Sequence, residues 1–119
     1  MRIAYVFFVL AAAALAVDAP SLSGKWQIHA SISGNESDYD CSFTQKAADL
    51  TGSCDSSRGA VQITGKVAEK GASWAYKTEY NGSPLTVSFA GKMESESKIT
   101  GTVTAEEYGV SGEFSAVKK

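Results

Sequence analysis

The stretch Leu50-Thr51-Gly52-Ser53-Cys54 carries a five-residue pattern that recurs along the chain: apolar, small, glycine, any residue, apolar. Side chains of an extended chain alternate between two faces, so the first, third and fifth positions share one face. On that face two apolar groups flank a glycine, which indicates a β-strand that bends or is closely approached at its centre. Further copies of the pattern occupy residues 63–67, 89–93, 99–103 and 110–114.

Alternating stretches of this kind fill the chain after its first 24 residues and are joined only by short turns. No gap has room for a helical crossover, so the strands must be antiparallel. Closing such a meander removes both sheet edges and covers the apolar face, which predicts an all-β, eight-stranded antiparallel up-and-down barrel. A two-sheet sandwich is the alternative. The expected strands are residues 25–33, 38–45, 50–56, 61–67, 74–80, 85–93, 99–105 and 108–116.

The N-terminus has the layout of a secretory signal peptide. Arg2 supplies one positive charge, an apolar run follows, and Ala14-Leu15-Ala16 is an A-x-A cleavage site. We expect residues 1–16 to be removed, with cleavage after residue 19 as a second option. A retained anchor is the other interpretation, but the apolar run is shorter than the roughly 20 residues needed to span a bilayer. This predicts a secreted or periplasmic protein with a flexible N-terminal segment at 17–23 and a barrel domain at 24–119.

The two cysteines, Cys41 and Cys54, both lie in the part expected to be exported, so they predict one disulfide, with a metal-binding pair or free thiols as the alternatives. The sequence contains a single histidine, His29, and no further soft ligands, so we expect no metal site. A net charge of −2 without a basic run gives no electrostatic footprint for nucleic acid. After the signal no apolar stretch is long enough for a membrane helix.

Two turns predict the pairing of neighbouring strands. A hairpin between 38–45 and 50–56 sets Cys41 opposite Cys54, near disulfide reach, and lays Phe43 over Gly52. By the same reasoning we expect Tyr76 to cover Gly65. Asn81-Gly82 predicts a type I′ hairpin. The pairs that follow from it are Thr78–Leu85, Tyr76–Val87 and Trp74–Phe89.

Several motifs resemble those of the avidin family. Residues 21–26 are similar to the opening of avidins, where Gly-x-Trp begins the first strand, and residues 50–53 and 63–65 resemble the LTG phrases of later strands. The resemblance implies a calycin-type barrel that holds a small ligand. Ile28 and Cys54 replace an Asn and a Tyr of the family's biotin site, whereas Ser56 keeps a hydroxyl. We therefore expect an avidin-like or lipocalin-like shape without tight biotin binding.

A weaker resemblance is to the periplasmic inhibitors of bacterial metalloproteases, which are small eight-stranded barrels with one disulfide. In that family a flexible N-terminal segment enters the protease cleft. The resemblance implies that residues 17–23 would play that part here and that the partner would be a protease.

The candidate site consists of inward-facing polar and aromatic residues near strand ends. Tyrosine joins a large apolar ring to a hydroxyl that needs a partner when buried, so such residues either plug the barrel ends or line a shallow pocket at one mouth. The ligand-binding candidates are Tyr39, Ser56, Trp74, Tyr76, Thr78, Tyr80 and Tyr108.

Catalysis is not expected. His29 falls on the outward side of its strand, and the inward positions hold no carboxylate or lysine for acid–base work. We expect a binding module without a cofactor, holding a small apolar or aromatic ligand at one mouth. The alternatives are a protease inhibitor or other protein-binding domain, and a structural domain without a pocket.

Overall fold

The structure is a computed structural model that describes residues 21–56 and 59–119. The expected signal peptide, residues 17–20 and residues 57–58 of the loop expected at 57–59 lie outside the described residues. The strands are β1 (Gly24–Ile32), β2 (Asn35–Lys46), β3 (Asp49–Ser56), β4 (Gly59–Val67), β5 (Gly71–Tyr80), β6 (Ser83–Ser95), β7 (Lys98–Ala105) and β8 (Val110–Lys118).

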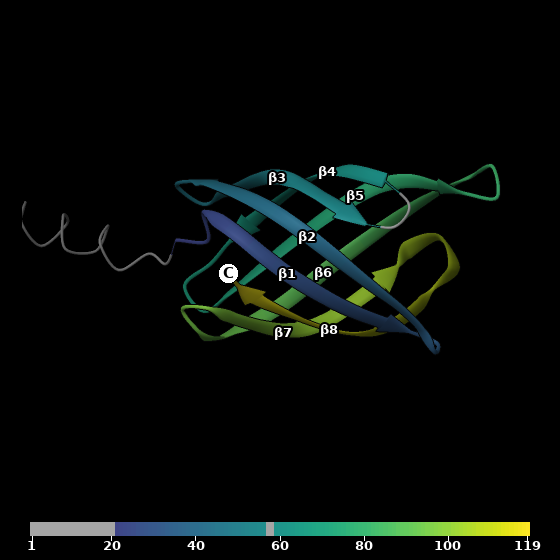
Figure 1. The fold of residues 1–119 in the computed structure, drawn as a ribbon. Coiled ribbons are helices and arrows are strands. Elements are labelled where there is room, and N and C mark those ends of the chain that lie inside the picture. The colour runs from purple at the N-terminus through teal and green to yellow at the C-terminus, as the bar shows by residue number, and fades with distance from the viewer. Residues whose placement is uncertain (1–20, 57–58) are drawn as a thin grey trace, which may run out of the picture.

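The strands form one closed antiparallel barrel in sequence order, and β8 pairs with β1 to complete it (Figure 1). This confirms the predicted eight-stranded up-and-down barrel and rules out the two-sheet sandwich. One element was not expected. A single 3₁₀ turn, η1 (Glu106–Tyr108), connects β7 to β8 and takes Tyr108 out of the strand in which the alternation had placed it.

The predicted register of β2 and β3 is confirmed. Phe43 lies opposite Gly52 and Cys41 opposite Cys54, and the two cysteines form a disulfide. A Cβ added to Gly52 would lie 2.1 Å from the carbonyl oxygen of Ser42, so only glycine fits where the backbones of β2 and β3 approach this closely.

The expected covering of Gly65 by Tyr76 is wrong. Gly65 pairs with Trp74, and an added Cβ would lie 2.7 Å from the Trp74 Cα. Tyr76 is the next inward residue of β5 after Trp74, so the predicted pairing was shifted by two residues along the strand. The sequence between β4 and β5 contains no turn motif that fixes their register, whereas Asn81-Gly82 fixes the register of β5 with β6.

Two-residue turns connect several strands. Asn81 and Gly82 have φ angles of 52° and 81°, and the three pairs predicted from this turn are all present. The first turn differs from the expectation, which placed it at residues 34–37. Ser33 and Gly34 make it alone, with φ angles of 52° and 83°, so β2 begins at Asn35.

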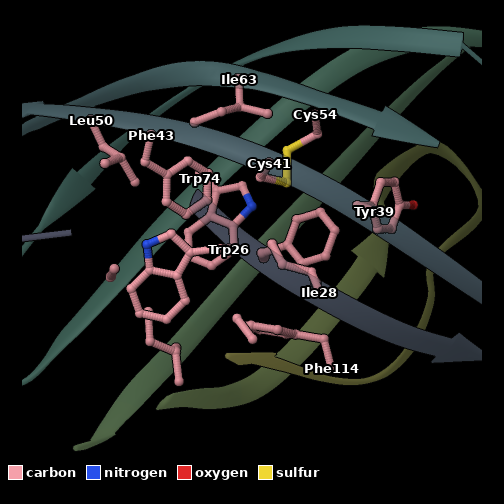
Figure 2. Packing of buried hydrophobic residues seen from close by; sticks show 14 of the residues in the cluster. Trp26, Ile28, Tyr39, Cys41, Phe43, Leu50, Cys54, Ile63, Trp74 and Phe114 are labelled. Atoms are coloured by element: carbon pink, nitrogen blue, oxygen red, sulfur yellow. A yellow bond between two sulfur atoms is a disulfide. The ribbon is translucent and has the colours of Figure 1, made fainter. Parts of the chain in front are cut away.

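The barrel interior is built mainly from aromatic rings. Trp74 stacks on Phe89 with ring centroids 5.4 Å apart, and the edges of Phe43 and Phe114 meet Trp74 at 5.2 and 5.5 Å. Figure 2 shows this cluster with the disulfide beside it. The core follows from the inward positions of the alternating pattern, since nearly all of its members come from them.

Residues 21–56 and 59–119 contain no helix that is long and apolar enough to cross a bilayer.

Candidate functional site

The barrel has two ends of different construction. We call the sealed end the one where β1 begins and where the turns 47–48, 68–70 and 96–97 lie. The open end carries the turns 33–34 and 81–82, and η1.

At the sealed end, Leu22 closes the interior. Its side chain is 0% exposed, although it precedes β1. The Leu22 N–H donates to Gln45 Oε1 at 2.8 Å, and the Leu22 carbonyl accepts from Trp26 Nε1 at 2.9 Å. The Gln45 N–H donates to Ser23 Oγ at 2.9 Å. Leu22 and Ser23 belong to the segment expected to be flexible, and the structure holds both against β2.

Main-chain hydrogen bonds join neighbouring connections at this end. Val67 N–H donates to the Ala48 carbonyl at 2.8 Å, and Lys118 N–H donates to the Ser97 carbonyl at 2.9 Å. The carbonyl of Lys70 is bonded in the same way, by the N–H of Met93. These bonds and the buried side chain of Leu22 close this end of the barrel.

At the open end the barrel wall is incomplete between β4 and β5. Their ladder runs from Val67–Ala72 only as far as Thr64–Ala75, whereas the β5–β6 ladder continues to the hairpin at Tyr80–Ser83. In the described part of β4 no ladder pair with β5 forms beyond Thr64. The end of β5 therefore pairs with β6 alone, and ladder hydrogen bonds do not close the barrel wall between β4 and β5 at this end.

Two tyrosines meet inside this mouth. The hydroxyls of Tyr39 on β2 and Tyr76 on β5 are hydrogen-bonded at 2.9 Å. Tyr39 is 8% exposed and Tyr76 is half-buried, so the pair lies just below the surface. Both rings rest on Phe89, at centroid distances of 5.9 and 6.4 Å. The pair presents polar atoms toward the mouth and apolar rings toward the core.

Trp74 lies deeper, beneath the tyrosines. It is 2% exposed and stacks on Phe89, its ladder partner on β6, whose ring also contacts those of Tyr39 and Tyr76. The structure thus brings three of the predicted site residues, Tyr39, Trp74 and Tyr76, around one ring, that of Phe89.

The other predicted residues lie apart from this group. Thr78 is exposed on β5. Tyr80 and Tyr108 are 41% and 50% exposed, and their ring centroids lie 6.2 Å apart. Tyr80 is four residues beyond Tyr76, which along a strand is about 13 Å. Ser56 donates to the Gly59 carbonyl at 3.3 Å at the rim. The alternation of side chains predicts the buried residues in the middle of the barrel. It does not predict that inward residues become exposed where the β4–β5 ladder stops.

Phe89 is the site residue that sequence reasoning missed. The signal was available, because the predicted hairpin already set Trp74 opposite Phe89. A phenylalanine carries no polar group, so its inward position by itself indicates a core residue and not a binding residue.

Carboxylates of η1 hold the open end on the β6 side. Glu107 accepts the Thr86 N–H at 2.6 Å through Oε1 and the Thr86 hydroxyl at 2.8 Å through Oε2. The Thr86 N–H bond is the main cause that lowers the pKa of Glu107, with the hydroxyl bond second. Glu106 accepts in the same way from the hydroxyl of Ser88.

His29 lies on the outer wall, as predicted. Its Nδ1 is 2.7 Å from Asp38 Oδ1 and its Nε2 is 2.5 Å from Glu36 Oε1. These hydrogen bonds, that of Asp38 first, raise the pKa of His29 above its usual value. A hollow of about 540 Å³ runs beside it over β1, β7 and β8, lined by hydroxyl groups and Glu113. Among the described residues no cluster of three or more His, Cys, Asp or Glu could hold a metal ion.

Neither a protein-family model nor a curated protein matches the chain. Among solved structures it is similar to redesigned β-barrels. One, b11L5F_LGL, has a TM-score of 0.64 at 12% identity, over 82% of this chain and 90% of that chain. Two others, mFAP1 and mFAP0, were solved bound to DFHBI, with TM-scores of 0.55 and 0.56, identities of 17% and 18%, and coverage of 82% of this chain and 94% and 98% of theirs.

At these identities the likeness shows the fold alone. The eight-stranded barrel predicted from the strand pattern is present, whereas none of these comparisons shows membership of the avidin family.

Proposed function

We propose that this protein is a binding module that holds a small apolar or aromatic ligand at the open end of its barrel. The observation that carries the proposal is the Tyr39–Tyr76 hydroxyl pair over Phe89, at the end where the β4–β5 ladder stops short. Small-molecule sites combine apolar walls with a few placed polar groups, and this mouth has both.

The ligand would pack on aromatic rings and be oriented by hydroxyls. Phe89, Tyr39 and Tyr76 offer ring faces and edges, which favour planar molecules. Two of the similar redesigned barrels, mFAP1 and mFAP0, were solved bound to DFHBI, which supports a small molecule as the ligand.

Biotin is not the ligand that these residues favour. At the position where the resemblance implies an Asn, Ile28 is buried and apolar, and Cys54 is consumed by the disulfide. A polar head group placed there would lose its hydrogen bonds at about 1–3 kcal/mol each. Tight biotin binding is therefore not part of the proposal.

We place the protein outside the cytoplasm, secreted or periplasmic. The signal-like N-terminal sequence and the Cys41–Cys54 disulfide support this, because disulfides persist in oxidising compartments. The proposal is for binding without catalysis and without a cofactor.

A small ligand is preferred over a protease as the partner. An inhibitor of the kind considered above would insert its N-terminal segment into a protease cleft. Leu22 and Ser23, the end of that segment, are instead hydrogen-bonded to Gln45 at the sealed end.

The test is a ligand screen on the disulfide-bonded protein by thermal shift, with DFHBI and a panel of planar aromatic molecules. A ligand at a hundredfold excess over its Kd stabilises the folded state by about 2.7 kcal/mol. Replacing Tyr39 and Tyr76 together by Phe removes both hydroxyls and should weaken binding about tenfold.

The matched control is the outer pair, Tyr80 and Tyr108, replaced together by Phe, which should leave the affinity unchanged. If no molecule in the panel raises the Tm, the proposal fails. It also fails if the outer pair matters as much as the inner pair.

A further inference from the structure

Trp74 has a hydrogen-bond donor that its surroundings leave unused. Within the described residues, its Nε1 is the buried side-chain nitrogen or oxygen for which no partner is present. The other indole, Trp26, donates to the Leu22 carbonyl at 2.9 Å. An indole N–H can only donate, and a buried donor without an acceptor lowers stability. Such a group in a barrel interior requires an explanation.

The neighbours of Trp74 cannot provide the acceptor. The rings in contact with it are Phe43, Phe89 and Phe114, and none carries a polar atom. A water molecule in this place would need two to four polar partners, which phenylalanine rings do not supply. An acceptor for Trp74 Nε1 therefore has to belong to a molecule that is itself largely apolar and can pack against these rings.

The nitrogen faces the side from which a ligand would enter. In Figure 2 the nitrogen of Trp74 lies on the edge of its ring toward Cys41 and Tyr39, whereas that of Trp26 lies on the opposite side. The polar groups above it on this side are the hydroxyls of Tyr39 and Tyr76. Each hydroxyl can donate and accept, so the pair can contact a polar group of a ligand as well as its partner.

We infer that Trp74 is the specificity-determining residue of the proposed site. The ligand class is a planar aromatic molecule with a hydrogen-bond acceptor, either a ring nitrogen or a carbonyl oxygen, at its inner end. The molecule enters from the open end as the Tyr39–Tyr76 pair parts, packs against Phe89, and accepts the hydrogen bond of Trp74 Nε1. This rests on the proposed function and names the ligand chemistry that it requires.

Quinoline and naphthalene test the inference, because these fused rings have the same size and differ by one ring nitrogen. The disulfide-bonded, ¹⁵N-labelled protein is titrated with each, and the two indole N–H signals are followed by NMR. Quinoline should shift the Trp74 signal downfield and leave that of Trp26 in place. It should also bind about tenfold more tightly than naphthalene, the ratio expected for one neutral hydrogen bond.

Trp74→Phe should remove this preference, so that both probes bind with the naphthalene affinity. The wild-type NMR result does not depend on how well the variant folds. Equal binding of both probes with the Trp74 signal unmoved overturns the inference and leaves the proposed function standing. Binding of neither probe, together with a flat thermal-shift screen, overturns both. A Trp74 N–H that contacts a bound water by NMR and ignores quinoline also overturns the inference.

Discussion

At the sealed end, main-chain hydrogen bonds and one buried leucine hold the connections together, whereas at the open end side-chain carboxylates do so. Val67 and Lys118 donate main-chain bonds to the turns beside them, and Leu22 fills the interior. At the other end, Glu107 binds Thr86 through its side chain. Main-chain bonds between packed connections do not depend on pH, while carboxylate bonds do. The comparison therefore predicts that substitutions at the sealed end lower the unfolding free energy most, and that the open end responds more to pH.

The largest effect should come from Leu22→Ala at the sealed end. Leu22 is fully buried, so the truncation should cost about 3.5 kcal/mol of unfolding free energy, as for other buried leucines. Urea unfolding measures it. Leu85→Ala is the control, because Leu85 is half-buried near the open end and should cost about 1 kcal/mol. Equal losses from the two variants would remove the distinction between the ends.

Removing the disulfide should have the next largest effect. The two cysteines are 13 residues apart, and the loop-closure entropy of such a bridge predicts a loss of about 3 kcal/mol for the Cys41→Ser, Cys54→Ser double variant. Hydrogen exchange then sharpens the comparison. Amides of β2 and β3 toward the open end should lose protection before those beside Gln45. Loss that begins at the sealed end would contradict this order.

Acid should loosen the open end by a smaller amount. The folded-state pKa of Glu107 is lowered from its usual value of 4.5, so its stabilising contribution is complete above that value. The contribution is lost as the pH falls through the lower folded pKa. Protection of the Thr86 amide should fall over this range, and Glu107→Gln should abolish the pH dependence. The Val67 amide at the sealed end is the control, and a parallel loss there would count against a local effect.

The smallest effect concerns His29, which is exposed on β1. Its folded pKa is raised above 6.5 by hydrogen bonds with Asp38 and Glu36, and the imidazolium form donates through both ring nitrogens. The stabilisation is therefore complete below 6.5 and is lost as the pH rises through the folded pKa. NMR titration of the His29 ring measures the shift, and Asp38→Asn should lower the pKa of His29 because it removes the largest of the causes that raise it. A pKa unchanged by that variant would show that the pair is not formed in solution.

The strand order and two of its registers could be predicted because they depend on local chemistry. Asn81-Gly82 fixes its own hairpin, and opposed partners on β2 and β3, Phe43 over Gly52 among them, agree on one alignment. The register of β4 with β5 could not be obtained in this way. The loop between them has no such turn signal, and Gly65 proved to face Trp74.

The candidate site was harder to predict because alternation tells which side a residue faces and nothing about its depth. Tyr39 and Tyr80 share the inward parity, yet one is buried and the other is 41% exposed. Leu22 belongs to no alternating pattern, so its role at the sealed end could not be read from the sequence. Both facts depend on how the finished barrel ends, which is a property of the whole chain.

The pairing of β1 with β8 has a consequence for how the molecule forms. Residues Trp26 and Lys118 are ladder partners, although nearly the whole chain separates them. Contacts this distant in sequence are slow to form, because a long loop must close before they contribute. A chain that emerges N-terminus first holds β1 with one unpaired edge until the last strand is released. The barrel can therefore close only late in folding. Until β8 is available, the unpaired edge of β1 must not pair with another strand.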